Sequence, residues 1–201
     1  MSRPKSIEND ALLRIAREVF LESGAFGSTK EIAKRAKLSE AALFKRFSTK
    51  AELFVAAMAP PAADTDAILL RARAEKDPRR ALQQLTRSVL AYYRSALPSI
   101  LHLITHPAIG IGALHDRLGH PQPLDLAIAG FLKEQQAAGR IHAPNVQAAA
   151  MMLVTALHSV VLFELMGVHG GSVSDAQLSA MTDVLWTGLR PTPSKPVRRT
   201  R

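Results

Sequence analysis

The chain of 201 residues contains no cysteine. This absence excludes disulfide bonds, thiolate zinc sites and thiol catalysis. Aromatic residues are scarce, and no stretch shows the sustained alternation of apolar and polar residues that marks a half-buried strand. The first residues also lack the apolar segment of a secretory signal peptide. We therefore expect an all-α protein of one or two domains that is soluble and cytoplasmic.

One long apolar run, residues 146–168, has the length of a membrane span. It contains His158, Ser159 and Glu164 together with many alanines, which are only weakly apolar. A helix inside a soluble protein explains this composition better than a transmembrane helix does. Because apolar residues fall on more than one of its faces, we expect residues 145–167 to form a helix that is buried nearly all round.

Positive charge is concentrated at the two ends of the chain. The formal net charge is +9, of which residues 1–58 contribute +4 and residues 190–201 contribute +5, while residues 59–189 are neutral. This distribution assigns any contact with a polyanion to the ends of the chain. A small basic excess can also simply keep a protein surface soluble.

Helix signals are dense in residues 1–58. Apolar residues recur at helical spacing over residues 12–20, and Gly24 then supplies a left-handed stop. The segments 28–31 and 49–52 both have the pattern of a capping box, in which a hydroxyl residue and a glutamate three positions later satisfy each other's backbone donors. Ser39 can cap a further short helix between them.

That short helix raises the question of what holds it in place. It has barely two turns, and a helix of this length is not stable alone in water. Leu43 and Phe47 can dock it on a neighbouring helix, while Lys45 and Arg46 in its middle need solvent or an anion. A helix, a tight turn and a docked second helix are typical of a helix-turn-helix motif, whose second helix enters the DNA major groove.

Longer helices are expected in residues 62–190. Residues 77–78 supply a cap and a proline at a helix start, and residues 174–177 have a third capping-box pattern. The final residues, 191–201, are rich in proline and basic residues, so we expect a disordered basic tail. Four prolines are expected to divide the middle of the chain into short pieces: Pro98, Pro107, Pro121 and Pro123.

Residues 11–54 resemble the N-terminal DNA-binding domain of TetR-type transcriptional regulators. The resemblance implies an N-terminal three-helix domain with the helix-turn-helix motif in residues 1–58, and a C-terminal helical ligand-binding and dimerisation domain in residues 62–190. It also implies a homodimer formed through the last two long helices, and a small ligand that releases the protein from operator DNA. The features that carry the resemblance are Phe20, Gly24, Thr29, Ile32, Ala33, Leu38, Ser39, Leu43, Phe44, Phe47, Lys50 and Leu53.

The same resemblance assigns DNA-contacting positions. Phe44 stands where the family most often has a tyrosine whose hydroxyl binds a phosphate, and Lys37 stands where the family usually has a glycine. If the turn requires a positive φ at Lys37, the lysine costs about 1 kcal/mol. The positions expected to contact DNA are Thr29, Lys30, Ser39, Glu40, Ala41, Ala42, Phe44, Lys45, Arg46 and Lys50.

Some of these residues suggest how bases would be read. Lys45 can donate to guanine, Glu40 can accept from cytosine, and Ala41 and Ala42 offer only methyl contacts to thymine. Alanine is also simply a good helix former, and an acid at position 40 is favoured near a helix N-terminus whether or not DNA is present. With so few donors, specificity can depend on DNA shape and on the spacing of half-sites.

The C-terminal domain offers candidates for a ligand pocket and for a dimer interface. Apolar side chains with a few polar ones are typical of small-molecule sites, although the same residues at helical spacing are more often plain core. The pocket candidates are Tyr92, Tyr93, His102, His106, Phe131, Met151 and His158. The candidates for the dimer interface are Val154, Leu157, Val161, Leu165, Leu178, Met181 and Leu185.

A different class of protein remains as the alternative. His102 and His106 are four residues apart, and with His158 or Glu164 they could bind zinc. The chain would then be a helical metal-dependent enzyme or a ligand carrier with only nonspecific affinity for DNA. However, the HExxH, GxSxG and GxxxxGK[ST] motifs are all absent from the sequence. We therefore expect no enzyme activity, no metal and no cofactor.

The sequence thus predicts a sequence-specific DNA-binding transcriptional regulator. Through the resemblance we expect a homodimeric repressor that binds a palindromic operator and is released by a small apolar or aromatic ligand. Repression is the family's most common mode of action, and the residues themselves are equally compatible with activation.

Overall fold

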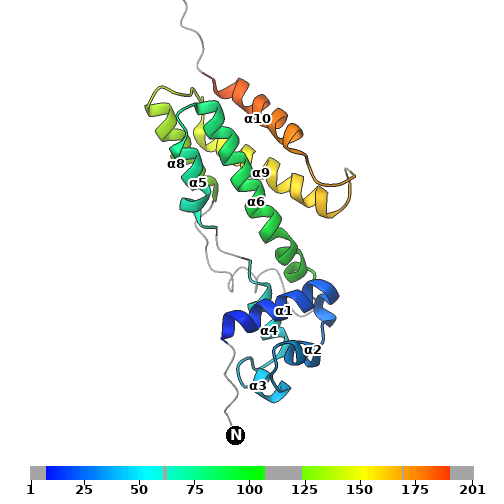
Figure 1. Ribbon diagram of the computed structural model, residues 1–201. Coiled ribbons are helices and arrows are strands. Elements are labelled where there is room, and N and C mark those ends of the chain that lie inside the picture. The colour runs from blue at the N-terminus through cyan, green and yellow to red at the C-terminus, as the bar shows by residue number, and fades with distance from the viewer. Residues whose placement is uncertain (1–7, 61–62, 107–123, 169, 191–201) are drawn as a thin grey trace, which may run out of the picture. The chain divides into compact units, whose positions relative to one another are not determined.

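A computed structural model describes residues 8–60, 63–106, 124–168 and 170–190 (Figure 1). Within these ranges the chain is helical and contains no strand, which confirms the predicted all-α class. The expected basic tail, residues 191–201, lies outside the described residues, as do Pro107, Pro121 and Pro123. The helices are α1 (Asn9–Ser23), the 3-10 turn η1 (Gly24–Phe26), α2 (Thr29–Arg35), α3 (Glu40–Phe44), α4 (Lys50–Met58), α5 (Thr65–Ala74), α6 (Pro78–Ile104), α8 (Leu124–Ala137), α9 (Val146–Leu165) and α10 (Asp175–Leu189).

The chain forms two compact units. The first comprises Met1–Pro61 and Ser95–His120, and the second comprises Ala62–Arg94 and Pro121–Arg201. Helix α6 therefore contributes its residues up to Arg94 to the second unit and its last residues to the first.

The core of the first unit is built from α1, α2, α3 and α4 together with the end of α6. Phe20 of α1 and Phe54 of α4 are fully buried and meet edge to face, with ring centroids 4.8 Å apart. Leu103 of α6 is part of the same core. Arg17 of α1 also reaches α6, donating to the buried hydroxyl of Ser99 at 2.6 Å. These contacts make the last residues of α6 an integral part of the first unit.

The capping predictions had mixed outcomes. At the start of α10 both halves of the predicted capping box are present, between Ser174 and Gln177. At α4 Thr49 caps as predicted, but Glu52 accepts from the backbone of Ser48 instead of that of Thr49. At α2 the predicted box is wrong, because the Ser28 side chain makes no capping bond. The glutamate of that pattern is bound to Arg35, at 2.9 Å.

The prediction that Pro98 would end a helix is also wrong. Helix α6 runs for 27 residues with Pro98 inside it. The proline removes one backbone donor and crowds the preceding turn, yet the helix continues because its buried side chains hold both flanks. Ala96, Leu97 and Leu103 are all buried, so packing overrides the local penalty.

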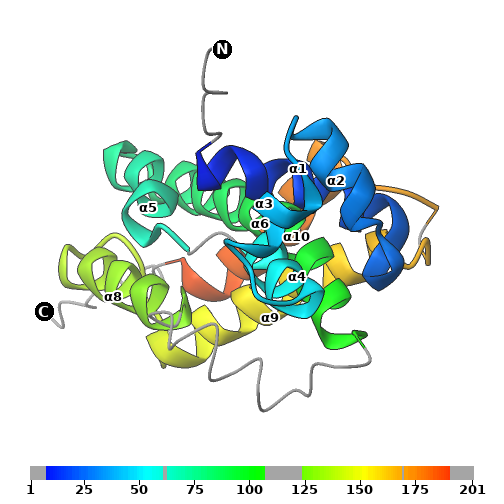
Figure 2. The ribbon, with the colours of Figure 1, turned by 90° about the horizontal axis from the view of Figure 1, so that it is seen from below.

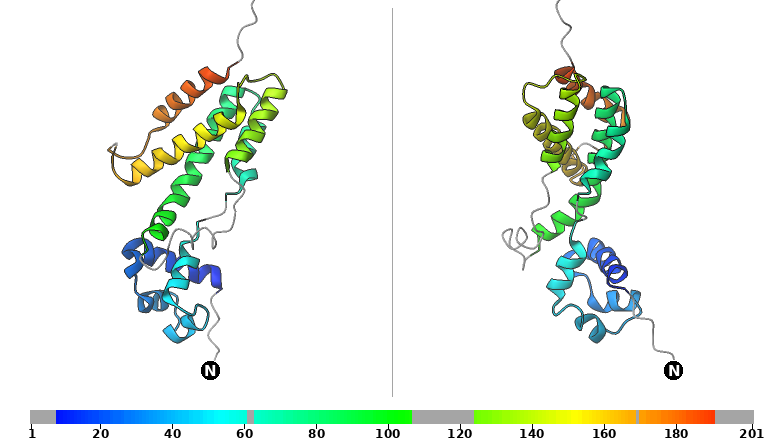
Figure 3. Two further views of the ribbon diagram at one scale, coloured as in Figure 1. Left: turned by 180° about the vertical axis from the view of Figure 1, so that it is seen from behind. Right: turned by 90° about the vertical axis from the view of Figure 1, so that its left-hand side faces the viewer.

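The second unit is a set of packed helices. Helix α8 packs against α9 (Figure 3) and also contacts α5 (Figure 2). The fully buried side chains of the second unit include Phe131 and Ile128 of α8 and Leu85 of α6. Helix α10 is tied to α6 at the surface, where the Arg79 guanidinium makes two bonds to the Asp183 carboxylate, at 2.8 and 2.9 Å.

Helix α9 differs from the prediction in its burial. It is long and apolar enough, by length and composition alone, to cross a membrane. We expected it to be buried nearly all round, but within the single chain it is buried on one face only. That face carries Ala149, Ala150, Leu153, Leu157 and Val161. Its remaining apolar side chains are half-buried or exposed, and that of Met152 is 66% exposed.

Glu164 joins three segments of the second unit. Its side chain, only 8% exposed, accepts two bonds from the guanidinium of Arg94 on α6, at 2.7 and 3.0 Å. It also accepts a bond from the backbone N–H of Val173, at 2.7 Å, just before α10. The bonds from Arg94 hold the pKa of the Glu164 carboxyl below its ordinary value, against the opposite effect of burial. Glu164 therefore fixes the connection between α9 and α10.

We expect Glu164→Gln to lower the unfolding free energy at pH 7 by about 1–2 kcal/mol, because charge-assisted bonds at a partly exposed arginine are lost. Because folding lowers this pKa, the wild-type advantage is present above the unfolded value of about 4.3 and is lost as the pH falls through the folded value. Thermal unfolding between pH 3 and 7 should show the two melting temperatures converging in acid.

The matched control is Glu134→Gln on α8. Glu134 meets Arg73 at 3.5 Å, and both side chains are well exposed, so its loss should leave the melting temperature unchanged. A Glu164→Gln protein whose deficit is the same at pH 3 and pH 7 would contradict the assigned role of the charge.

Candidate nucleic-acid interface

The turn between α2 and α3 has a well-defined hydrogen-bond pattern. The Lys37 N–H donates to the carbonyl of Lys34 at 3.1 Å, and the Leu38 N–H donates to that of Ala33 at 2.9 Å. These two bonds form a Schellman motif, which places the residue after the helix cap in the left-handed region. That residue is Lys37, with φ of 54°. The turn therefore does require the positive φ that the sequence analysis considered.

Helix α3 has five residues and is held by its surroundings. The Ser39 hydroxyl accepts from the Ala42 N–H at 3.1 Å and caps the helix as predicted. Leu43 is fully buried, and Phe47 beyond the helix is also buried, both in the core of the first unit. Lys45 and Arg46 follow the helix instead of lying in its middle, because Lys45 is already its C-cap. The short helix is thus docked by its apolar side, with two cations at its end.

The ten positions expected to contact DNA all lie on the surface of the first unit. None is buried, and those that are well exposed are Lys30, Ser39, Ala41, Phe44 and Lys45. Phe44 is 39% exposed, so an apolar ring stands at the surface at this position. The residues that are half-buried are Thr29, Glu40, Ala42, Arg46 and Lys50.

Two of these positions bond to each other. The Thr29 hydroxyl, at the start of α2, donates to the Glu40 carboxylate, at the start of α3, at a distance of 2.7 Å. The sequence suggested that Glu40 reads a base or is favoured by the helix dipole, and this bond to Thr29 is a third role. The bond links the first residues of the two helices. No local signal could have revealed it, because the partners are eleven residues apart.

Cations of this region differ in how they are engaged. Arg35 binds Glu22 and Glu31, at 3.0 and 2.9 Å, and its bonds lower the pKa of the Glu22 carboxyl. Arg46 donates to the side-chain oxygen of Asn9 at 3.2 Å. In contrast, five lysine side chains make no hydrogen bond or salt bridge within the described residues: Lys30, Lys34, Lys37, Lys45 and Lys50. Residues 28–50 carry a formal charge of +5, so the surface is rich in available cations.

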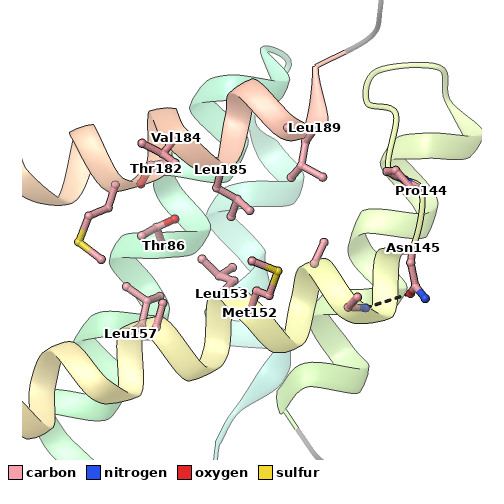
Figure 4. A pocket seen from close by; sticks show the side chains of 15 residues that line it. Thr86, Pro144, Asn145, Met152, Leu153, Leu157, Thr182, Val184, Leu185 and Leu189 are labelled. Atoms are coloured by element: carbon pink, nitrogen blue, oxygen red, sulfur yellow. Dashed lines mark hydrogen bonds between the residues drawn. The ribbon is translucent and has the colours of Figure 1, made fainter.

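The second unit contains a groove between α9 and α10. Its volume is about 490 Å³, and its walls are mainly apolar (Figure 4). Two hydroxyls in it, those of Thr86 and Thr182, donate to carbonyls of their own helices, at 2.8 Å each. The groove therefore suits an apolar occupant. Its walls include Met152, Leu153, Leu157, Val184 and Leu185.

The seven pocket candidates do not line this groove. Tyr92, Tyr93 and His158 form one aromatic cluster, with the Tyr93 and His158 rings 5.4 Å apart. Burial is the main cause that raises the pKa of Tyr93 to about 12. Phe131 is buried beside a much smaller cavity, and Met151 is exposed.

The two remaining pocket candidates, His102 and His106, belong to the first unit. His106 lies beyond the last residue of α6, and its ring packs on Phe54 with centroids 4.4 Å apart. The two histidines therefore do not form the helical pair of the metal hypothesis, and Glu164 is bound to Arg94. Within the described ranges no group of three potential metal ligands comes together.

The dimer candidates divide into two groups. Leu157, Val161 and Leu178 are buried within the single chain and serve its own core. Leu165 and Met181 are exposed, and Val154 and Leu185 are half-buried. Further exposed apolar side chains beside these candidates are those of Met152 and Val184, the latter at 77% exposure.

We expect the bond between Thr29 and Glu40 to stabilise the first unit. A double-mutant cycle with Thr29→Val and Glu40→Ala, measured by chemical denaturation, should give a coupling energy of about 1–2 kcal/mol, since a hydroxyl bonds a charged group at a partly buried site. Additive effects of the two substitutions would contradict it. The matched pair Thr49→Val and Glu40→Ala should be additive, because these residues share no bond.

The comparisons with known proteins agree with this geometry. Residues 12–57 match the model of the bacterial regulatory proteins of the tetR family. No curated protein matches the chain. A putative TetR-family transcriptional regulator from Mesorhizobium loti is 20% identical, with a TM-score of 0.66 over 90% of this chain and 96% of that one.

Two further solved structures have the same fold. PfmR, a TetR-family transcriptional regulator from Thermus thermophilus, is 20% identical, with a TM-score of 0.60 over 90% of this chain and 99% of its own. The transcriptional regulator FadR from Bacillus subtilis, solved in complex with stearoyl-CoA, is 14% identical, with a TM-score of 0.64 over 90% and 99%. Residues 12–57 therefore form a helix-turn-helix domain of the tetR family, and the described chain has the fold of these regulators, which together support a DNA-binding transcriptional regulator.

Proposed function

We propose that the protein is a cytoplasmic homodimeric repressor, which binds a palindromic operator and is released by a small apolar or aromatic ligand. The observation that carries the proposal is the docked five-residue helix α3, whose flanks present lysines without partners among the described residues. Such lysines are solvated in the free protein, and phosphates can replace their water when DNA binds.

Contacts with the DNA backbone come from both ends of the helix-turn-helix motif. Lys30 and Lys50 bind phosphates through their ammonium groups, and Thr29 does so through its backbone N–H, because its hydroxyl hydrogen is held by Glu40. The Ser39 hydroxyl donates to a phosphate while its oxygen keeps accepting from Ala42. Phe44 lacks the hydroxyl that a tyrosine would offer, so its ring makes only apolar contact. Arg46 adds charge beside it.

Base contacts come from the exposed side of α3 and its C-cap. Lys45 donates to guanine, and the methyl groups of Ala41 and Ala42 pack on thymine. Glu40 is bound to Thr29, so its main role is to orient α3 against α2. Lys45 is then the principal side chain that reads a base by hydrogen bonds, and shape readout and half-site spacing supply the rest.

The dimer forms through the apolar faces that α9 and α10 leave uncovered. Met152, Met181, Val184 and Leu185 surround or line the groove between these helices. A second copy of the chain is the occupant that we assign to this groove, because exposed apolar side chains continue beyond its edges to Met151. A two-fold axis at this face makes the interface self-complementary and pairs two recognition helices on a palindrome.

The ligand acts by shifting a population. It binds in the second unit, where Tyr92, Tyr93 and His158 supply an aromatic cluster. A ligand that binds more tightly to the conformation that mismatches the operator shifts the protein toward that conformation and releases the DNA. The resulting loss of DNA affinity can be as large as the ratio of the ligand's affinities for the two conformations. The stearoyl-CoA in the FadR complex is a precedent, within this fold, for a bound molecule with a long apolar chain.

Selection from random duplexes tests the proposal. Purified protein at near-physiological salt should enrich a palindrome, and Lys45→Ala should lose discrimination at one base pair per half-site by about 1–3 kcal/mol. Lys133→Ala, an exposed lysine on α8, is the control and should select the wild-type palindrome. If duplexes are recovered without enrichment of any sequence, and their recovery falls uniformly as the salt concentration rises, the protein binds DNA only through its charge.

The dimer face is tested by introducing a charge. Val184→Glu should convert the dimer to a monomer at micromolar concentration, because a carboxylate would be buried without a partner. Sedimentation equilibrium gives the mass directly. Leu126→Glu on α8 replaces another exposed apolar residue, at 56% exposure, and should remain dimeric. A monomeric wild type, or a dimeric Val184→Glu protein, would place the interface elsewhere.

A further inference from the structure

The chain makes the same turn at the ends of three helices. After α8 the N–H groups of residues 139 and 140 donate to the carbonyls of Gln136 and Gln135, and after α9 those of residues 167 and 168 donate to Glu164 and Phe163. Both pairs of bonds form the Schellman pattern found after α2. In the turns after α8 and α9 the left-handed residue is a glycine, Gly139 and Gly167, each with φ of 68°. After α2 it is Lys37, with φ of 54°.

Lysine is therefore not what the turn geometry selects. Among the described residues Lys37 is the only one other than glycine with a positive φ. A side chain with a Cβ is strained in this region, whereas glycine is not. The other two turns show that this chain uses glycine where only the backbone matters.

Nothing within the described part of the chain offsets this strain. The Lys37 side chain is exposed, and its ammonium makes no hydrogen bond or salt bridge there. The apolar contact that accompanies such a turn is supplied by the next residue, Leu38, which packs against the core of the first unit. The Lys37 side chain thus contributes nothing visible to folding.

The position of Lys37 does suit a contact with DNA. Lys37 lies two residues before Ser39, the cap of α3, within a segment of formal charge +5. Strained residues that the fold does not need are found preferentially at functional sites. We propose that Lys37 binds a DNA phosphate beside the recognition helix, and that its charge raises DNA affinity at the expense of folding stability. This inference rests on the proposed function, since it adds a backbone contact to the same interface.

The test uses the full-length protein and the substitution Lys37→Gly. Two changes of opposite sign are expected. The melting temperature should rise by about 2–4 °C as the strain is removed. Affinity for the selected operator and for random duplex should fall by the same factor. The slope of log K against log salt should become shallower by about 1.8 for the dimer, because each protomer loses one phosphate contact worth about 0.9.

Lys37→Arg is the matched control, since it keeps both the charge and the strain and should leave the melting temperature and the salt slope at their wild-type values. A second control, Lys133→Ala, removes a distant lysine and should leave the slope unchanged. A Lys37→Gly protein with the wild-type salt slope would overturn the proposed contact, and one with an unchanged or lower melting temperature would overturn the exchange of stability for affinity.

Failure of the proposed function is recognised separately. If the wild-type protein enriches no palindrome, sequence-specific repression is refuted. The salt slopes of the wild-type and Lys37→Gly proteins on random duplex still decide whether Lys37 contacts phosphate.

Discussion

The docking of helix α3 on the core of the first unit is the interaction on which the proposed DNA-binding surface depends. A helix of five residues has too few hydrogen bonds to repay its own nucleation. Leu43 and Phe47 hold it by burial, the Ser39 cap satisfies a free donor at its start, and the bond from Thr29 to Glu40 fixes it to α2. The orientation of α3 is thus set by tertiary contacts, and its polar side stays available.

Arginine and lysine side chains make different interactions in the described part of this chain. Within the described residues every salt bridge is made by an arginine, as with Arg35 on α2, Arg79 and Arg94 on α6, and Arg73 on α5. The planar guanidinium can meet both oxygens of a carboxylate at once, which suits it to fixing structure. The lysines of residues 28–50 are left without such partners. The residues that hold the fold are therefore largely separate from those available to a polyanion.

The helix-turn-helix domain could be predicted from sequence because its signals are local. The stop at Gly24, the cap at Ser39 and the apolar spacing of Leu43 and Phe47 all act within a few residues, and each is found in the structure. The continuation of α6 through Pro98 could not be predicted, because distant packing decides it.

Longer-range features were missed for the same reason. The bond between Thr29 and Glu40, the partners of Glu164 and the groove between α9 and α10 join residues that are far apart in the chain. Apolar composition showed that α9 would bury a face, but periodicity alone could not separate the face that packs within the chain from the face left uncovered.

The core of the first unit includes Leu103, and Arg17 is bonded to Ser99, although both partners come from α6 and not from the N-terminal segment. A fragment that stopped after α4 would leave a hole in that core and an arginine without its acceptor. The first unit therefore cannot be obtained as a single continuous fragment by cutting the chain at one point. In a chimera that moves its DNA preference to another regulator, the last turns of α6 must travel with residues 8–60, or the receiving protein must offer an equivalent leucine and serine.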